Sequence, residues 1–280
     1  MTTVYMLTSQ SRVQMMSFII KSDDCLLVVD GGNTCDADFL CTYVRSLGGK
    51  IDGWFLTHPH SDHIDAMYSL LERRFDDVEL GTIYLNFPSD EFLKTADPNQ
   101  FEHVVRLREQ FATHNIKPHI VHVGDAYNFG EMTIKVLREP DESITTGDPY
   151  NNASVVYRLE ADGKSMIFLG DLGVDGGKQL LEQVPRHLIK ADYVQMAHHG
   201  QNGVDKPVYE AIDPDYCFWC TPDWLWDNDA GRGYDTHSWK TIVTRGWMSE
   251  IGVKWHYISK DGTHEVPLAE ERKNIEKRKK

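Results

Sequence analysis

The chain has 280 residues, 41% of them hydrophobic, and a formal net charge of −14 at pH 7. A chain of this length and composition is able to bury a core of ordinary size, so we expect a globular protein. The acidic excess argues against a long nucleic acid as partner, because binding its phosphates depends on clustered lysine and arginine.

The N-terminal residues lack the basic start, apolar core and small-residue cleavage site of a secretory signal, and no apolar run approaches the length of a membrane span. We therefore expect a cytoplasmic protein with no membrane partner. The five cysteines are odd in number and sparse, which does not suit a disulfide framework. Cys217 and Cys220 form a CxxC, but without a second pair we interpret them as buried thiols.

The first part of the chain alternates strand-like and helix-like patterns. Strands are expected at residues 18–20 and 25–29, followed by a break at Gly31 and Gly32. A helix-like stretch over residues 37–47 precedes a buried strand at residues 53–56. Apolar residues then recur at helical spacing from Ile64, so a helix is expected to follow the polar stretch that ends at His63.

The rest of the chain continues the same alternation. Helices are expected at residues 98–114 and around 179–188, and strands at residues 82–85, 119–123, 132–137, 154–159, 165–169, 193–197 and 253–258. This mixture indicates sheets with helices packed outside them. With no repeat and no long linker, we expect a single domain over residues 1–280, with a variable insert within 76–148 and a solvated basic tail at 271–280.

The segment Thr57-His58-Pro59-His60-Ser61-Asp62-His63 crowds three histidines and an aspartate onto the loop between a strand and a helix. In extended chain, residues two apart point the same way, so His58 and His60 are able to face one ion. Asp62 and His63, around the bend, are able to face a second. Imidazole and carboxylate are usual ligands of zinc and related metals, whereas surface histidines behind a helix cap are the alternative interpretation.

Two later stretches offer the further ligands that one short segment cannot supply. Asp171 follows the apolar run 166–170, and a carboxylate at the end of a strand is well placed to bridge two cations. His198 and His199 follow the next apolar strand. Each of these motifs is weak alone, but their order along the chain makes the metal site a specific hypothesis.

At this point the chain resembles the metallo-β-lactamase-fold hydrolases. The resemblance rests on four stretches: Val28-Val29-Asp30-Gly31-Gly32-Asn33, the HxHxDH of residues 58–63, the LGD that ends at Asp171, and Ala197-His198-His199-Gly200. It implies a four-layer αβ/βα sandwich, an α/β fold of two β-sheets flanked by helices, with two divalent metal ions at one edge. It also implies that His58 and His60 hold the first metal, Asp62 and His63 the second, and that Asp171 bridges them.

One expected histidine is missing, shortly before the strand that precedes Asp171. That place reads Tyr150-Asn151-Asn152-Ala153-Ser154-Val155-Val156. The Asn-x-Ser-Val-Val pattern with a later HHG resembles the branch that contains ComEC/Rec2 competence proteins and phosphorylcholine esterases, which implies phosphoester or phosphodiester substrates. It makes Asn152 a candidate catalytic residue, beside Asp62.

The roles of the two adjacent histidines are open, because strand parity places them on opposite faces without showing which face meets the metals. We favour His198 as the ligand and His199 as a catalytic residue in contact with substrate. Asp30 is the candidate for orienting a ligand histidine through its second ring nitrogen, and a turn aspartate is the alternative. His237 is a candidate for the edge of the site, against the alternative of a loop histidine.

These observations predict a metal-dependent hydrolase that acts on a phosphoester or phosphodiester of a small molecule, with two divalent cations, zinc first and manganese or iron as alternatives. A lactone, thioester or amide hydrolase of the same fold is the second hypothesis, and a metal-binding regulatory protein without turnover is the third. Trp224 and Trp226, in an aromatic-rich loop, are candidates for the pocket wall, although core packing explains them equally well. The oligomeric state stays open.

Overall fold

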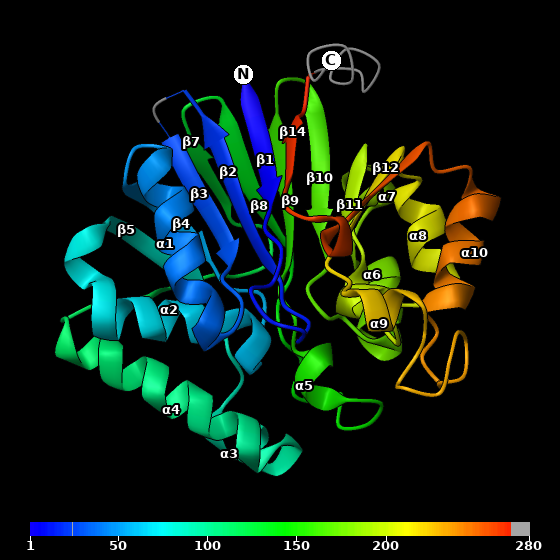
Figure 1. Cartoon of the computed structure of the whole chain (residues 1–280), viewed down its shortest axis with the longest axis horizontal. Coiled ribbons are helices and arrows are strands. Elements are labelled where there is room, and N and C mark those ends of the chain that lie inside the picture. The colour runs from blue at the N-terminus through cyan, green and yellow to red at the C-terminus, as the bar shows by residue number, and fades with distance from the viewer. Residues whose placement is uncertain (24, 270–280) are drawn as a thin grey trace.

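Two seven-stranded β-sheets lie face to face, with helices on the outer side of each (Figure 1). The structure is a computed structural model and describes residues 1–23 and 25–269. The basic tail expected at residues 271–280 lies outside the described residues. None of the helices in the described part is long and apolar enough to cross a membrane.

The first sheet is antiparallel on one side and parallel on the other. In spatial order its strands are β14 (His264–Pro267), β1 (Thr2–Met6), β2 (Ser17–Ser22), β3 (Cys25–Asp30), β4 (Lys50–Phe55), β5 (Glu79–Leu85) and β6 (His119–Ile120). Strands β14 to β3 pair antiparallel, and β3 to β6 pair parallel. The parallel part carries the loops that matter for the site.

The second sheet has the same division. Its strands are, in order, β13 (Trp255–Ile258), β12 (Tyr216–Trp219), β11 (Tyr193–Gln195), β10 (Lys164–Phe168), β9 (Val156–Ala161), β8 (Met132–Arg138) and β7 (Ala126–Phe129). Strands β10 to β13 pair parallel, whereas β7 to β10 pair antiparallel. Each sheet is therefore mixed.

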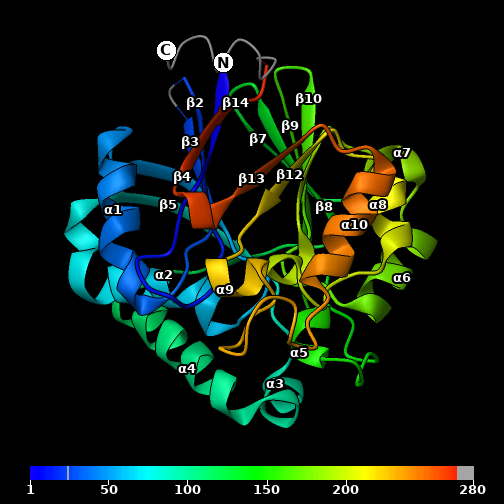
Figure 2. The same ribbon diagram turned by 45° about the vertical axis from the view of Figure 1, so that its right-hand side comes forward.

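The helices are divided between the two outer faces and the lower edge of the sheets (Figures 1 and 2). Against the first sheet lie α1 (Ala37–Ser46) and α2 (Ser61–Arg74), with α4 (Pro98–Thr113) packed on α2 and α3 (Asp90–Ala96) packed on α4 toward the lower edge. Against the second lie α6 (Val174–Gln183), α7 (Arg186–Ile189), α8 (Lys206–Ile212) and α10 (Thr241–Ile251). At the edge lie α5 (Pro149–Asn152) and α9 (Asp223–Trp226), and the 3₁₀ turns are η1 (Thr34–Asp36), η2 (Phe75–Asp77), η3 (Ala197–Gly200) and η4 (Ser259–Asp261).

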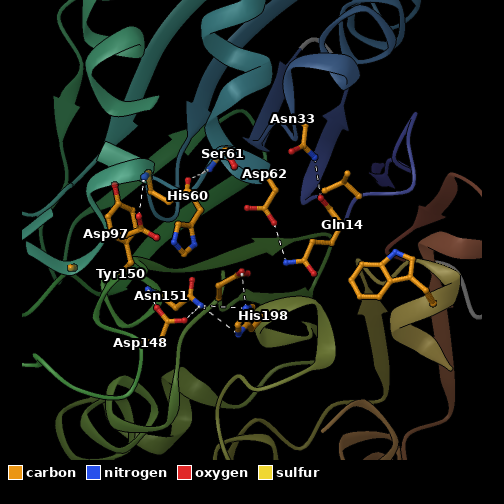
Figure 3. A pocket seen from close by; sticks show the side chains of 15 residues that line it. Gln14, Asn33, His60, Ser61, Asp62, Asp97, Asp148, Tyr150, Asn151 and His198 are labelled. Atoms are coloured by element: carbon orange, nitrogen blue, oxygen red, sulfur yellow. Dashed lines mark hydrogen bonds and ion pairs between the residues drawn. The ribbon is translucent and has the colours of Figure 1, made fainter. Parts of the chain in front are cut away.

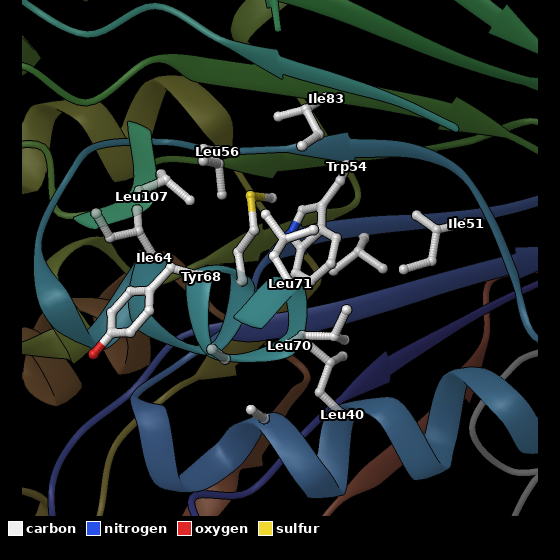
Figure 4. Packing of buried hydrophobic residues seen from close by; sticks show 14 of the residues in the cluster. Leu40, Ile51, Trp54, Leu56, Ile64, Tyr68, Leu70, Leu71, Ile83 and Leu107 are labelled. Carbon is white, nitrogen blue, oxygen red and sulfur yellow. The ribbon is translucent and has the colours of Figure 1, made fainter. Parts of the chain in front are cut away.

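The hydrophobic residues form three layers of core, which explains why the strands read as nearly continuous apolar runs. In β3, Leu26 and Val28 face the helices on one side, whereas Leu27 and Val29 face the other sheet. Trp54 of β4 packs in the outer layer with residues of α1 and α2 (Figure 4). Two sheets between two layers of helices make the αβ/βα sandwich expected from the sequence, so the predicted fold class is confirmed.

Several element boundaries differ from the sequence expectation. Helix α2 begins at Ser61, so its first turn contains part of the histidine-rich segment. The stretch expected as one helix at residues 179–188 is split between α6 and α7 by Pro185, and β1, β7 and β14 were not predicted. Residues 76–148, expected to hold a variable insert, also contain strands β5 to β8 of the two sheets.

Strand direction brings four loops to one edge of the sandwich. The carboxyl ends of β3 and β4 in one sheet, and of β10 and β11 in the other, all lead to this edge. Gln195, at the end of β11, is fully buried and binds the backbone there: its Oε1 accepts hydrogen bonds from the N–H groups of Leu169 and Gly170, and its Nε2 donates to the carbonyls of Gly170 and Met196.

We expect Gln195→Leu to lower the free energy of unfolding by about 3 kcal/mol or more, because it leaves two buried N–H groups without a partner in addition to losing two donated bonds. Urea unfolding of the metal-free protein measures this. Gln183→Leu, at the exposed end of α6, is the matched control and should change stability by less than about 0.5 kcal/mol. Equal stability of the two variants would contradict the assigned role.

Candidate metal centre

The histidine-rich segment changes backbone conformation partway along, and this change divides its side chains into two groups. After β4 the chain stays extended through His60, which has φ −76° and ψ 151° and precedes the first residue of α2. His58 and His60 therefore lie on extended chain, whereas Asp62 and His63 lie in the first helical turn. This is the division expected from the sequence.

The first group of candidate ligands consists of Asp62, His63, Asp171 and His199. The Nε2 atom of His199 lies 3.1 Å from Oδ2 of Asp62 and 3.3 Å from Oδ2 of Asp171. The Nε2 atom of His63 lies 3.3 Å from Oδ1 of Asp171. Two imidazoles and two carboxylates thus converge within the spacing of ligands around one small cation.

The second group consists of His58, His60 and again Asp171. Nε2 of His58 is 3.0 Å from Nδ1 of His60 and 4.0 Å from Oδ2 of Asp171. Asp171 is therefore common to both groups, the position that a bridging carboxylate occupies. Five residues expected as metal ligands, His58, His60, Asp62, His63 and Asp171, are brought together by the fold.

Asp171 reaches both groups because two loops approach closely at Gly170. This glycine has φ +57°, and a Cβ atom there would lie 2.9 Å from the side chains of Thr57 and Ser154. The hydroxyl of Ser154 also accepts a hydrogen bond of 3.1 Å from the backbone N–H of Asp171. Ser154, the serine of the Asn-x-Ser pattern, thus has a structural role: it holds the loop that carries Asp171.

The donor atoms fit a metal centre. Nε2 of His63, Nε2 of His199 and Oδ1 of Asp171 are buried, and none has a hydrogen-bond partner among the described residues. Leaving buried polar atoms unpaired costs free energy, and a cation between them removes that cost. The set contains imidazole and carboxylate but no thiolate, which suits zinc, manganese or iron.

The outward-facing nitrogens of two candidate ligands have buried partners. Nδ1 of His63 is 2.7 Å from Oδ2 of Asp30, and Nδ1 of His199 donates to the carbonyl of Cys220 at 3.0 Å. Asp30 is also held by Thr57, whose N–H donates to Oδ1 and whose hydroxyl donates to Oδ2. The structure places Asp30 where the sequence analysis expected it, with Nε2 of His63 left facing the metal centre.

Burial and charge shift the pKa values of these groups in opposite directions. Burial alone raises the pKa of Asp171, but His199 and His63 beside it bring the value well below its usual range. Burial also opposes charge on His199, yet the nearby Asp171 and Asp62 raise its pKa to about 9. Burial, helped by the neighbouring His63, lowers the pKa of His58 well below its usual value. The two groups thus differ electrostatically: the carboxylates raise the pKa values of His63 and His199 in the first group, whereas the pKa of His58 in the second is lowered.

The two adjacent histidines take the reverse of the expected placement. His198 and His199 lie in turn η3, not in a strand, and both have left-handed φ values of 50° and 54°. Alternation of faces along a strand therefore does not apply. His199 is buried within the first ligand group, whereas Nε2 of His198 is 3.9 Å from Oδ2 of Asp171 and its side chain is partly exposed. His199 therefore lies in the first group of candidate ligands, and His198 lines the neighbouring cavity.

A cavity of about 420 Å³ opens over the two ligand groups (Figure 3). Its lining includes His60, Asp62, Asp171 and His198, together with the aromatic residues Tyr150 and Trp224. Its other lining residues are Val13, Gln14, Asn33, Ser61, Ala96, Asp97, Gln100, Asp148 and Asn151. The described lining contains neither lysine nor arginine.

Asn151 and Tyr150 occupy the place of the histidine that the sequence lacks. The Tyr150 ring stacks on the His60 imidazole with centroids 4.6 Å apart and planes 6° apart. Nδ2 of Asn151 donates to Oδ2 of Asp148 at 2.8 Å and lies 3.3 Å from Nε2 of His198. The cavity beside His58 and His60 is therefore lined by an aromatic ring and an amide in place of a further imidazole.

Asn152 does not line the cavity. Its Oδ1 accepts from the N–H of Gly176 at 2.8 Å, and its Nδ2 donates to the carbonyls of Gly147 and Asp148. All its polar atoms are thus used to fasten α5 and the preceding loop to α6. The expectation of a catalytic Asn152 is corrected: its neighbour Asn151 is the amide that reaches the site.

The aromatic candidates separate in the same way. Trp224 lines the cavity, whereas Trp226 packs edge-on against Trp219 of the core and carries the Arg245 guanidinium 4.1 Å from its ring centroid. His237 is exposed and does not line the cavity. Its ring lies 3.6 Å from that of Trp239, which contacts Trp224 in turn. Trp226 therefore has a structural role, and His237 stands outside the described lining.

Sequence reasoning missed Gln14, Asn151 and Tyr150. Gln14 lies on the loop between β1 and β2, where no motif marks it. Asn151 and Tyr150 lie within the stretch that the sequence analysis singled out, but the choice between neighbouring asparagines depends on the short helix α5. A helical turn sends adjacent side chains in different directions, and that helix was not predicted.

The chain is similar in sequence to one known protein and in fold to several solved structures. Over 157 residues the chain is 27% identical to ComE operon protein 3 of Bacillus subtilis (strain 168), a match that covers 55% of this chain and 18% of that protein. The fold is similar to that of YhfI from Bacillus subtilis, with a TM-score of 0.58, 14% identity and coverage of 95% of this chain and 100% of the other. It is also similar to Zn²⁺-bound PqqB from Methylobacterium extorquens, with a TM-score of 0.55, 12% identity and coverage of 96% and 100%.

The family of the protein is identified by a sequence match that covers most of the chain. Residues 12–204 match the metallo-beta-lactamase superfamily. This range includes Asp30, the histidine-rich segment, Asp171 and both histidines of turn η3. The chain belongs to the metallo-beta-lactamase superfamily.

Proposed function

We propose that this protein is a metal-dependent hydrolase with two divalent cations and a small phosphodiester or phosphoester as substrate. One observation carries the proposal: two groups of buried imidazoles and carboxylates share Asp171 and border a cavity of about 420 Å³. Members of the superfamily to which the chain belongs are mostly metal-dependent hydrolases. Zinc is the cation we propose first, since the ligands are imidazole and carboxylate, and manganese or iron are the alternatives.

The residues divide the work of such a centre. His58, His60 and Asp171 would hold one cation, and Asp62, His63, His199 and Asp171 the other. When bound, such a pair supplies Lewis-acid polarisation of the attacked bond and a water nucleophile of lowered pKa. Among the chain's own groups, His198 and Asn151 border the cavity and are placed to donate hydrogen bonds to substrate oxygens.

The charged residues that line the cavity favour a substrate with little negative charge. Besides the candidate ligands it carries Asp97 and Asp148, and the described lining has no lysine or arginine to pair with several negative charges. A phosphodiester has one negative charge, whereas a polyphosphate has several, so the lining favours a diester of a small molecule. The similarity to part of ComE operon protein 3 agrees with the phosphoester branch expected from the sequence.

A neutral lactone, thioester or amide is the second candidate substrate class. The same absence of cations from the described lining favours it, because a carbonyl substrate has no charge that needs a partner. The chemistry that a pair of cations would supply here serves carbonyl centres as well as phosphoryl centres. A cytoplasmic location and a small-molecule partner remain parts of the proposal.

The test is a substrate panel with controlled metal loading. Protein stripped with a chelator and reloaded with zinc, manganese or iron should hydrolyse bis(p-nitrophenyl) phosphate and leave lactones, thioesters and β-lactams unchanged. Elemental analysis should find two metal ions per chain. Turnover of the carbonyl substrates alone would support the second candidate, and a loaded protein inert on the whole panel would support a regulatory role without turnover.

A pair of adjacent variants tests the assignment of the two histidines in turn η3. His199→Ala should lose one of the two metal ions, because it removes a ligand from the first group. His198→Ala should keep both ions and lower kcat by about 10-fold to 1,000-fold, the range expected when a hydrogen-bond donor to the reacting group is lost. Loss of metal from His198→Ala with retention in His199→Ala would reverse the assignment.

Asp30→Asn tests the partner of His63. Removing the charged acceptor of the imidazole N–H should weaken binding of the cation held by His63 by about 10-fold to 100-fold. Chelator competition measures this affinity, and circular dichroism checks that the chain stays folded. Asp38→Asn, on the exposed side of α1, is the control. Wild-type affinity in Asp30→Asn would show that Asp30 serves only the turn after β3.

A further inference from the structure

Gln14 lies on the loop between β1 and β2 and extends its side chain to a candidate metal ligand (Figure 3). Its Nε2 donates to Oδ2 of Asp62 at 3.3 Å. This is the same carboxylate oxygen that lies 3.1 Å from Nε2 of His199. The carboxylate of Asp62 is thus approached by the ligand group on one side and by an uncharged amide on the other.

A second glutamine determines which way the Gln14 amide faces. Nε2 of Gln201 donates to Oε1 of Gln14 at 3.1 Å. An ionised carboxylate only accepts hydrogen bonds, so Asp62 must meet the NH₂ end of Gln14, and the oxygen end must then accept from Gln201. The order Gln201 to Gln14 to Asp62 is therefore a chain of donors with one direction.

This chain of hydrogen bonds joins the two halves of the site. Gln14 lies on a loop of the first sheet and Asp62 in the first turn of α2, which packs against that sheet. Gln201 follows turn η3 of the second sheet and donates its backbone N–H to the carbonyl of His198. The backbone of Gln14 is itself fastened, because its carbonyl accepts from Nδ2 of Asn33 at 3.0 Å. The Met16 N–H also donates to the Asp62 carbonyl at 3.1 Å. Hydrogen bonds thus hold Gln14 both at its backbone carbonyl and at its side-chain amide.

We propose that Gln14 is a positioning residue for Asp62, and that Gln201 acts through Gln14 to keep the amide N–H directed at that carboxylate. By holding one oxygen of Asp62, the pair leaves the carboxylate oriented for the cation shared with His63, Asp171 and His199. The inference rests on the proposed function only in assuming that cations bind. A histidine that binds a metal is commonly oriented by a hydrogen bond from its second ring nitrogen to an outer partner. Here the candidate ligand is the Asp62 carboxylate, and the Gln14 amide is the outer partner.

The experiment measures zinc binding and needs no substrate. Zinc affinity is determined by chelating-dye competition for the full chain and for Gln14→Met, Gln201→Met and the double variant, since methionine keeps the length of the side chain without its hydrogen bonds. Gln10→Met is the matched control: Gln10 lies on the same loop and is exposed, and its side-chain amide donates to the Thr8 carbonyl and to no candidate ligand among the described residues. Thermal melting of each metal-free variant checks the fold.

We expect Gln14→Met to weaken one of two zinc sites by about 10-fold, the size typical for loss of an outer partner of a ligand. Gln201→Met should weaken the same site less. The double variant should match Gln14→Met alone, because Gln201 has no route to Asp62 once Gln14 is replaced. Gln10→Met should bind zinc as the unaltered chain does, and melting temperatures should agree.

Three results would overturn the proposal. Unchanged affinity in Gln14→Met would remove its positioning role, and additive losses in the double variant would show that Gln201 acts independently. An equal loss in Gln10→Met would attribute the effect to the loop as a whole. These outcomes are distinct from failure of the proposed function. An unaltered chain that binds two zinc ions but hydrolyses nothing on the panel refutes the hydrolase and leaves the positioning role of Gln14 intact. A chain that binds neither zinc, manganese nor iron refutes both.

Discussion

The sharing of one buried carboxylate, Asp171, between two groups of ligands is the constraint on which the rest of the site depends. A single side chain reaches both groups only if loops from two different sheets approach within van der Waals contact. Gly170 permits that approach, since any side chain there would overlap Thr57 and Ser154. Gln195 then binds the backbone of Leu169 and Gly170, and Ser154 accepts from the N–H of Asp171 itself, so that the close approach is maintained.

The parallel halves of the two sheets explain why this meeting point exists. In each sheet, neighbouring parallel strands deliver their carboxyl ends to the same edge, and the two sheets face each other across a continuous apolar layer. The ligands therefore stand on loops, while the strands behind them supply rigidity. Asp30, His198 and His199 all adopt left-handed backbone conformations at this edge, which are uncommon for residues other than glycine. Such conformations persist where surrounding structure enforces them, and they gather at functional sites.

Agreement between sequence and structure is good where local pattern decides the outcome. The apolar runs of β3, β4 and β10 and the helical spacing after His63 identify their elements, because burial on both faces and a 3.6-residue period leave distinct marks in the sequence. Agreement is poorer where a short turn replaces the end of a strand. Turn η3 cannot be read from Ala197-His198-His199-Gly200, and the face that each histidine presents depends on it. Helix α5 likewise decides between Asn151 and Asn152, and four residues are too few to show a period.

The sequence by itself indicated sheets flanked by helices, the division of the histidine-rich segment into two pairs, and a carboxylate at the end of a later strand, because these follow from apolar patterning and from ligand chemistry. The four-layer sandwich was implied by the resemblance to the metallo-β-lactamase-fold hydrolases. Only the tertiary structure decided that His199 and not His198 lies in the first group of candidate ligands, that Asn151 and Tyr150 line the cavity, and that Gln14 reaches Asp62 and is itself reached by Gln201. Those choices depend on contacts between residues as far apart as Gln14 and Gln201. Their separation is set by how two sheets pack, and a linear pattern contains no measure of that distance.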